Sequence, residues 1–250
     1  MLKLARHNEA AEVFFSEQGE GKSVGRPSVF VRLSRCNLYC FWCDTDYTWN
    51  WKGTRYPHVR DSAVGSKFDK AEETVLMDAD ALTELVRRFP CHHLVITGGE
   101  PLVQMKDLAT WLTELKASFP EYHVEFETNG TLTPSVELDA VADQYNVSVK
   151  LSNSRVKESE RIRPEAIRFF VASPKSNFKF VLDNNRDLEE VQSLQATFNI
   201  APERIYLMPQ GTTPGELNER MPWIQALCEQ HGYQPSDRLH IHKYGSRRGV

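Results

Sequence analysis

The chain has few cysteines, and their number excludes several structural roles. It contains 5 cysteines in 250 residues, and Cys36, Cys40 and Cys43 lie together in the stretch CNLYCFWCDT. Disulfides need an even number of thiols, and a closed zinc site or a complete ferredoxin cluster needs four ligands. The group of three therefore either recruits another residue or keeps one coordination position open. Cys91 and Cys228 stand alone in apolar or helical patterns and are predicted to be core residues.

Long apolar runs and an excess of positive charge are also absent. Without a run of about 18 apolar residues the chain has no predicted membrane span, and MLKLARHNEAAEVFF lacks the apolar centre of a signal peptide. The 30 Lys+Arg against 34 Asp+Glu give no polybasic surface, so we expect no nucleic-acid partner. These absences predict a cytoplasmic protein, where thiols stay reduced and a cysteine group holds metal.

Short apolar segments alternate with amphipathic helical segments along the chain. The predicted strands are residues 28–33, 93–99, 123–130, 147–152, 178–183, 204–211 and 238–244. The predicted helices are residues 80–89, 105–119, 187–198 and 216–231, with Gly232 ending the last. Such alternation indicates a parallel sheet with right-handed crossovers.

The number of these units is smaller than the eight of a closed barrel. The sequence therefore predicts an α/β fold, a partial (open) TIM-like barrel of about six βα units, in a single domain over residues 1–250. Residues 47–77 break the rhythm and are predicted to be a loop-rich insertion. A loop this long inside a domain either serves the active site, for example as a lid, or covers a local surface patch.

The cysteine group directly follows the predicted strand 28–33, at the end where parallel α/β folds build their active sites. Soft thiolate ligands favour iron–sulfur clusters or zinc over hard cations. Three thiols would leave one iron of a 4Fe–4S cluster open, whereas a zinc site would need a fourth ligand such as Asp44 or His58. Both interpretations remain open at this point.

The residues of this loop carry a resemblance to a known family. CNLYCFWC resembles the CX3CX2C motif of the radical S-adenosylmethionine (SAM) superfamily, and LVITGGEP (94–101) resembles its GGEP motif. The resemblance implies that the three thiols hold a 4Fe–4S cluster whose open iron binds SAM. It also implies an external one-electron donor of the flavodoxin or ferredoxin type. A glycine pair alone would equally fit a tight strand-to-helix turn.

Further motifs narrow the resemblance. FFSEQGEG (14–21), GRPSVFVRLSRCN (25–37), CDT (43–45), ETNG (127–130), KLSNS (150–154), FKFVL (178–182), YLMPQG (206–211) and HKY (242–244) are similar, in this order, to the 7-carboxy-7-deazaguanine synthase family. That resemblance implies a lyase of deazapurine and queuosine biosynthesis. Such an enzyme converts 6-carboxy-5,6,7,8-tetrahydropterin to 7-carboxy-7-deazaguanine with release of ammonia, and it uses Mg²⁺ and forms a homodimer.

The same resemblance implies the site residues. The residues expected at SAM are Trp42, Asp44, Gly98, Gly99, Glu100, Glu127, Ser148, Lys150, Met208, Pro209, Gln210 and Gly211. The residues expected at the pterin are Glu17, Gln18, Gly19, Glu20, Arg32, Thr97 and Val250, and Thr45 is expected at magnesium. Taken alone, Glu127, Ser148 and Lys150 would fit capping or surface roles.

Arg32 is also singled out by its place in the sequence. It lies on an apolar strand, between Val31 and Leu33 and four residues before Cys36. A guanidinium pointing inward there could hold a carboxylate through two charge-assisted hydrogen bonds, whereas the alternative is an arginine exposed on the strand.

Two segments depart from the family pattern. Ser148-Val149-Lys150 stands where many relatives read SPK, and in the basic tail HKYGSRRGV we expect Arg247 or Arg248 to face solvent.

Two other functions stay open. The first alternative function is a glycyl-radical-enzyme activating enzyme, which would need a docking surface for a protein partner. The second is a non-catalytic zinc or iron–sulfur module.

Overall fold

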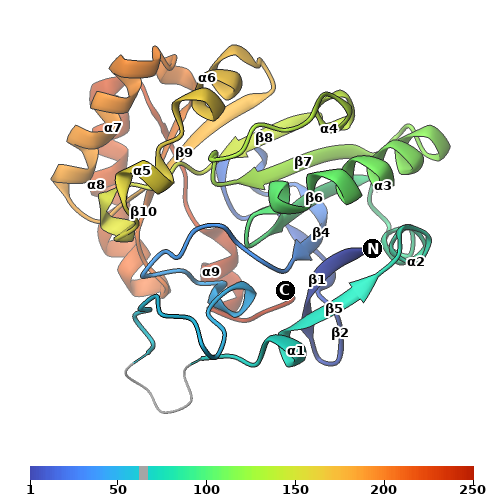
Figure 1. Ribbon diagram of the computed structural model, residues 1–250. Coiled ribbons are helices and arrows are strands. Elements are labelled where there is room, and N and C mark those ends of the chain that lie inside the picture. The colour runs from blue at the N-terminus through green and yellow to red at the C-terminus, as the bar shows by residue number, and fades with distance from the viewer. Residues whose placement is uncertain (62–66) are drawn as a thin grey trace.

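The computed structural model describes residues 1–61 and 67–250, whose strands form one sheet with helices on its outer side (Figure 1). The strands are β1 (Leu2–His7), β2 (Ala10–Ala11), β3 (Val13–Glu17), β4 (Pro27–Leu33), β5 (Thr74–Met77), β6 (His93–Gly98), β7 (His123–Thr128), β8 (Gln144–Val147), β9 (Ser176–Leu182), β10 (Ile205–Pro209) and β11 (Gln234–Pro235). The helices are α1 (Lys70–Glu73), α2 (Ala79–Val86), α3 (Met105–Ser118), α4 (Val136–Val141), α5 (Glu158–Arg161), α6 (Pro164–Ala172), α7 (Asn185–Phe198), α8 (Pro214–His231) and α9 (Leu239–Tyr244).

The sheet is an open barrel. Its strand order is β11-β10-β9-β8-β7-β6-β4-β1-β2, with β3 paired to β4 and β5 to β1. Neighbours from β4 through β11 run parallel, whereas β1, β3 and β5 add antiparallel strands at one side. No pairing between described residues joins β11 to the other end. The predicted partial TIM-like barrel is confirmed.

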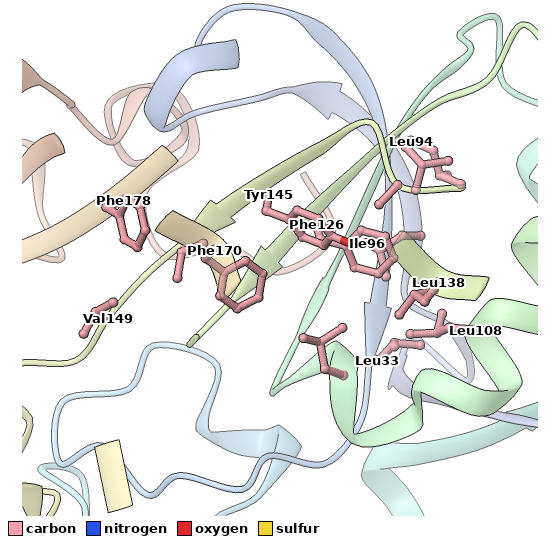
Figure 2. Packing of buried hydrophobic residues seen from close by; sticks show 14 of the residues in the cluster. Leu33, Leu94, Ile96, Leu108, Phe126, Leu138, Tyr145, Val149, Phe170 and Phe178 are labelled. Carbon is pink, nitrogen blue, oxygen red and sulfur yellow. The ribbon is translucent and has the colours of Figure 1, made fainter. Parts of the chain in front are cut away.

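The parallel strands pack one apolar face against the helices, whereas polar side chains such as Arg32 and Lys179 enter the barrel from the other face. Leu94 and Ile96 of β6 are fully buried in the hydrophobic core, together with Phe126 of β7. Figure 2 shows these side chains packed with Leu108 of α3 and Leu138 of α4. Successive strand residues point to opposite faces of a sheet, so the residues between them point into the barrel.

The four predicted helices are confirmed as α2, α3, α7 and α8, with small shifts of their ends. Local sequence signals explain their limits. A capping box of Thr213 and Glu216 begins α8, and Gly232, with a φ of 72°, ends it. No helix that the structure describes is long and apolar enough to cross a membrane.

Two predicted strands are wrong. The strand predicted over 147–152 lies earlier in the chain, as β8. It was not predicted there because Gln144 and Asn146 point into the polar interior, and polar residues at these positions are typical of a loop. The segment predicted as a strand over 238–244 is the helix α9. Over six residues a short alternation of apolar and polar residues fits a strand or a helix equally well, and Ile241 is the one buried residue of α9.

The N-terminal strands were not predicted, and the insertion holds more structure than expected. β1 and β2 form a hairpin through Asn8 and Glu9, which both have positive φ. Within residues 47–77, α1 and β5 are regular, and β5 pairs with β1. Residues 62–66 of the predicted insertion, Gly65 among them, lie outside the described residues.

Candidate active site

A cavity of about 280 Å³ opens at the carboxyl ends of the parallel strands. It is lined by all but one of the residues predicted from the sequence. Those lining it are Glu17, Gln18, Gly19, Glu20, Arg32, Cys36, Cys40, Trp42, Cys43, Asp44, Thr45, Thr97, Gly98, Gly99, Glu127, Ser148, Lys150, Met208, Pro209, Gln210, Gly211 and Val250. The fold therefore brings together residues from sequence segments more than 200 positions apart.

The exception is Glu100, which does not line the cavity. Its carboxylate is fully buried and accepts hydrogen bonds from the backbone N–H of Leu102 (3.0 Å) and Asn129 (2.6 Å) and from the hydroxyl of Thr128 (2.9 Å). Burial raises its pKa despite these donors. This carboxylate joins the end of β6 to the end of β7, and the expected place of Glu100 at SAM stays a prediction.

The cysteine loop is fixed by its contacts with residues 153–156. The Phe41 N–H donates to the carbonyl of Ser154 at 2.9 Å, and the Trp42 indole donates to that of Asn153 at 3.0 Å. Buried Leu38 packs with Val156. These contacts hold the three thiols on one side of the cavity.

The thiols suit a bound metal cluster. Burial raises the pKa of Cys36, Cys40 and Cys43, that of Cys40 to about 12. Alone, these groups would therefore stay protonated at neutral pH, and a cationic metal centre would be needed to stabilise three thiolates so close together. The donor set fits a 4Fe–4S cluster, since soft sulfur ligands favour iron–sulfur chemistry.

The two residues considered as a fourth zinc ligand are engaged elsewhere. The His58 ring makes a 2.8 Å hydrogen bond through Nε2 to the carbonyl oxygen of Cys43 and lies 3.2 Å from Asp46 through Nδ1. The Asp44 carboxylate pairs with Arg238. Neither completes a tetrahedral site with the thiols, which disfavours zinc.

The glycine pair after β6 packs against backbone. A Cβ atom on Gly98 would overlap the Leu33 backbone, and one on Gly99 would overlap the Arg35 carbonyl. The N–H of Gly99 donates to the Leu33 carbonyl at 3.1 Å. These glycines thus let the chain that leads to the cysteines cross the end of β6.

A buried group of charges on the cavity wall was not predicted. Lys179 of β9 is 7% exposed and forms ion pairs with Glu20 and, at 2.9 Å, with Glu127. Arg238 pairs with Glu20 (3.1 Å) and Asp44 and donates to the Gly211 carbonyl at 2.7 Å. Lys179 carries the same signal that singled out Arg32, a basic residue between apolar neighbours on a strand, whereas no sequence signal pointed to Arg238.

Amide and carboxylate groups lie beside these charges. The Gln18 side-chain NH₂ donates to Glu125 at 2.8 Å and to Glu127 at 3.1 Å, and the Asn146 NH₂ donates to the same two carboxylates. Burial by itself raises the pKa of Glu127, and it stays raised although Lys179 acts against this. Of these residues Gln18 and Glu127 line the cavity, where their hydrogen bonds hold an amide and a carboxylate in positions suited to a flat polar ring.

Arg32 points into the cavity from β4, and its Nε donates to Glu12 at 2.8 Å. Thr97, opposite it in the register of β4 and β6, also lines the cavity. Thr45 follows the cysteines with its hydroxyl 3.6 Å from the Cys43 sulfur. Lys150 donates to the Ser148 hydroxyl at 2.8 Å. The two residues are therefore in contact although the segment Ser148-Val149-Lys150 departs from the family pattern.

The C-terminal segment forms part of the cavity wall, and Figure 1 shows it returning to the side of β1. The expectation of a solvent-facing arginine is wrong for Arg248, which forms ion pairs with Glu12 (3.1 Å) and Glu73 (2.9 Å). The same expectation is confirmed for Arg247, which is exposed. The pairing of Arg248 is a long-range contact, which no local pattern reveals.

Comparisons with known proteins agree with this arrangement. Residues 31–201 match the family model of the radical SAM superfamily. A 7-carboxy-7-deazaguanine synthase of Pyrobaculum aerophilum is 37% identical over 95% of both chains. Those of Rhodopirellula baltica and Halobacterium salinarum are 32% and 35% identical over 96% and 92% of this chain and 88% of theirs.

A solved structure shares the fold. The crystal structure of QueE from Escherichia coli aligns with a TM-score of 0.67 and 25% identity, covering 91% of this chain and 92% of that one. The match to the superfamily model and the near full-length similarity to curated relatives lead to one assignment. The chain belongs to the 7-carboxy-7-deazaguanine synthase family of the radical SAM superfamily.

Proposed function

We propose that this chain converts 6-carboxy-5,6,7,8-tetrahydropterin to 7-carboxy-7-deazaguanine with release of ammonia. The observation that carries the proposal is one cavity that presents three thiols, an inward arginine and a wall of amide and carboxylate groups. The family of the chain supports the same reaction. A glycyl-radical activating enzyme would need a docking surface for a protein, and this polar cavity fits a small ring better.

The residues would divide the work by their chemistry. A 4Fe–4S cluster held by Cys36, Cys40 and Cys43, with SAM, would supply a 5′-deoxyadenosyl radical that takes a hydrogen atom from the substrate. The guanidinium of Arg32 would bind the substrate carboxylate. Gln18, with the carboxylates beside it, would orient the ring through hydrogen bonds.

Other residues would complete the environment. The Thr45 hydroxyl would be one oxygen ligand of Mg²⁺, which needs further oxygens from substrate and water. The strand-end segment Met208–Gly211 and the Ser148–Lys150 pair would contact SAM. The C-terminal segment and the aromatic rings of Trp42 and Trp49 line the cavity and would keep water from the reacting atoms.

The reaction also requires partners outside the chain. We propose a flavodoxin- or ferredoxin-type protein as the one-electron donor, because the described residues hold a single group of three cavity thiols. We propose a homodimer on the family resemblance alone. Light scattering of the reconstituted protein would give twice the mass of 28.7 kDa if this is right.

The test is anaerobic reconstitution with iron and sulfide, followed by carboxytetrahydropterin, SAM, Mg²⁺ and a reductant. The deazaguanine acid should appear with the wild-type protein. Cys40→Ala should abolish both its formation and SAM cleavage. Arg32→Ala should raise the KM for the pterin about tenfold or more, since a charge-assisted pair is lost, and leave SAM binding intact. Zinc without sulfide, and no binding of SAM, would refute the proposal.

A further inference from the structure

The carboxylate of Glu12 is shared between two arginines. Its side chain is 1% exposed. The Oε1 oxygen accepts from the Nε of Arg32 at 2.8 Å and from the hydroxyl of Tyr47 at 3.1 Å, whereas Oε2 accepts from Nη2 of Arg248 at 3.1 Å. Arg32 therefore binds Glu12 through Nε and one oxygen only. Its two Nη groups make no hydrogen bond to any residue that the structure describes.

The site around Arg248 is specific and closely packed. Its Nη1 donates to Glu73 at 2.9 Å, Nη2 also donates to the carbonyl of Arg6, and the guanidinium carbon lies 3.5 Å from the centre of the Tyr47 ring. The next residue, Gly249, has a φ of 71° and packs so closely on His7 that a Cβ atom would lie 2.9 Å from the ring. Groups from four separate segments thus hold this arginine in place.

We propose that Arg248 is a positioning residue that keeps the guanidinium of Arg32 available for the substrate. A carboxylate with both oxygens free prefers a planar guanidinium that donates two parallel hydrogen bonds. If Oε2 were free, Arg32 could turn and bind Glu12 with both of its outer N–H groups. Because Arg248 occupies Oε2, this pairing is blocked, and the Nη groups of Arg32 stay directed at the cavity.

This inference rests on the proposed function, because it needs a ligand with a carboxylate. It makes a specific claim that simple anchoring of the C-terminal segment does not. Loss of Arg248 should weaken recognition of the carboxylate and leave recognition of the ring almost unchanged. Anchoring alone would affect every ligand of the cavity to a similar degree.

The experiment measures binding of 6-carboxypterin and of pterin, which has the same ring without the carboxylate, to the reconstituted holoenzyme with SAM. For Arg248→Ala we expect about tenfold weaker binding of 6-carboxypterin and less than about a twofold change for pterin. Arg248→Lys should fall between, because an ammonium can replace one contact with Glu12 or Glu73. Arg88→Ala is the matched control. Arg88 is an exposed arginine that does not line the cavity, so its loss should change neither affinity.

Two results would overturn the proposal. Equal weakening of both ligands would assign Arg248 to anchoring, and unchanged binding would remove any role. If Arg248→Ala does not fold, the ratio of the two affinities in Arg248→Lys decides by the same criteria. Wild-type protein that does not prefer 6-carboxypterin over pterin would contradict the proposed function itself, so failure there is separate from failure in the variants.

Discussion

Gly98 and Gly99 lack side chains where the chain leaving β4 crosses the end of β6. Gly98 has a φ of 134°, which residues with a Cβ rarely adopt, and its Cα faces the Leu33 backbone. Ser34, then Arg35, also at positive φ, and then Cys36 follow along that backbone. At the scale of single residues, the position of the Cys36 thiol therefore depends on the absence of a side chain at Gly98 of the neighbouring strand.

Gly98→Ala should disturb this crossing. Strain at positive φ and the clash with Leu33 should together lower the free energy of unfolding by about 2 kcal/mol or more. Urea unfolding of the cluster-free protein measures this, and the iron content after reconstitution should fall with it. Gly215→Ala is the control, since a Cβ there meets no atom within 4 Å. Equal stability of the two variants would contradict the explanation.

The parallel strands are the elements that place the polar groups. On β9, Phe178 and Phe180 enter the core, whereas Lys179 between them enters the barrel and pairs with two carboxylates. Alternation of side chains along a strand thus gives each strand one face for the core and one for the cavity. The same pattern on β4 places Arg32 in the cavity.

Lys179→Met should be strongly destabilising. The methionine keeps the volume of the side chain but leaves Glu20 and Glu127 buried with less positive charge, which costs about 3 kcal/mol. Arg220→Met removes a more exposed ion pair with Asp183 and should cost less than about 1 kcal/mol. Chemical unfolding of both variants checks the difference, and comparable losses would mean that Lys179 contributes little as a charge.

At the scale of the whole molecule, buried ion pairs join segments that are far apart in sequence. Glu20 follows β3, Asp44 follows the cysteines, and Arg238 precedes α9, yet these three form one connected group. Burial by itself raises the pKa of Glu20, but Lys179 and Arg238 lower it well below its ordinary value of 4.5. The folded chain therefore keeps this carboxylate charged in acid.

This charge makes stability depend on pH. Below about pH 4.5 the unfolded chain takes up a proton at Glu20 that the folded chain does not, so the contribution of Glu20 is lost as the pH falls. In Glu20→Gln this term is absent. The stability of the wild type should approach that of the variant by up to about 1.4 kcal/mol for each pH unit below 4.5. Unfolding curves from pH 6 to 3.5 test this, and parallel pH profiles would refute it.

The sequence determined the elements with strong local signals. Helices α3 and α8 follow from their periodicity and caps, and the cysteine loop follows from the spacing of three thiols after an apolar strand. Strand β8 escaped prediction because its inward residues are polar, and α9 because six residues do not distinguish a period of two from one of 3.6. Local patterns show where a side chain points only if its neighbours are apolar.

The tertiary structure alone decided which charges meet. Nothing near Arg248 in the sequence indicates Glu12 or Glu73, and nothing near Arg238 indicates Asp44 or Glu20. Ion pairs depend on distance in space, and residues more than 170 positions apart approach only when the sheet curves and the C-terminal segment returns to β1. The sequence by itself thus determined the thiols and the kind of sheet, and it singled out Arg32 as a candidate site residue. The ion-pair partners of Arg238 and Arg248 were decided by packing, because a buried charge is stable only when an opposite charge lies close to it.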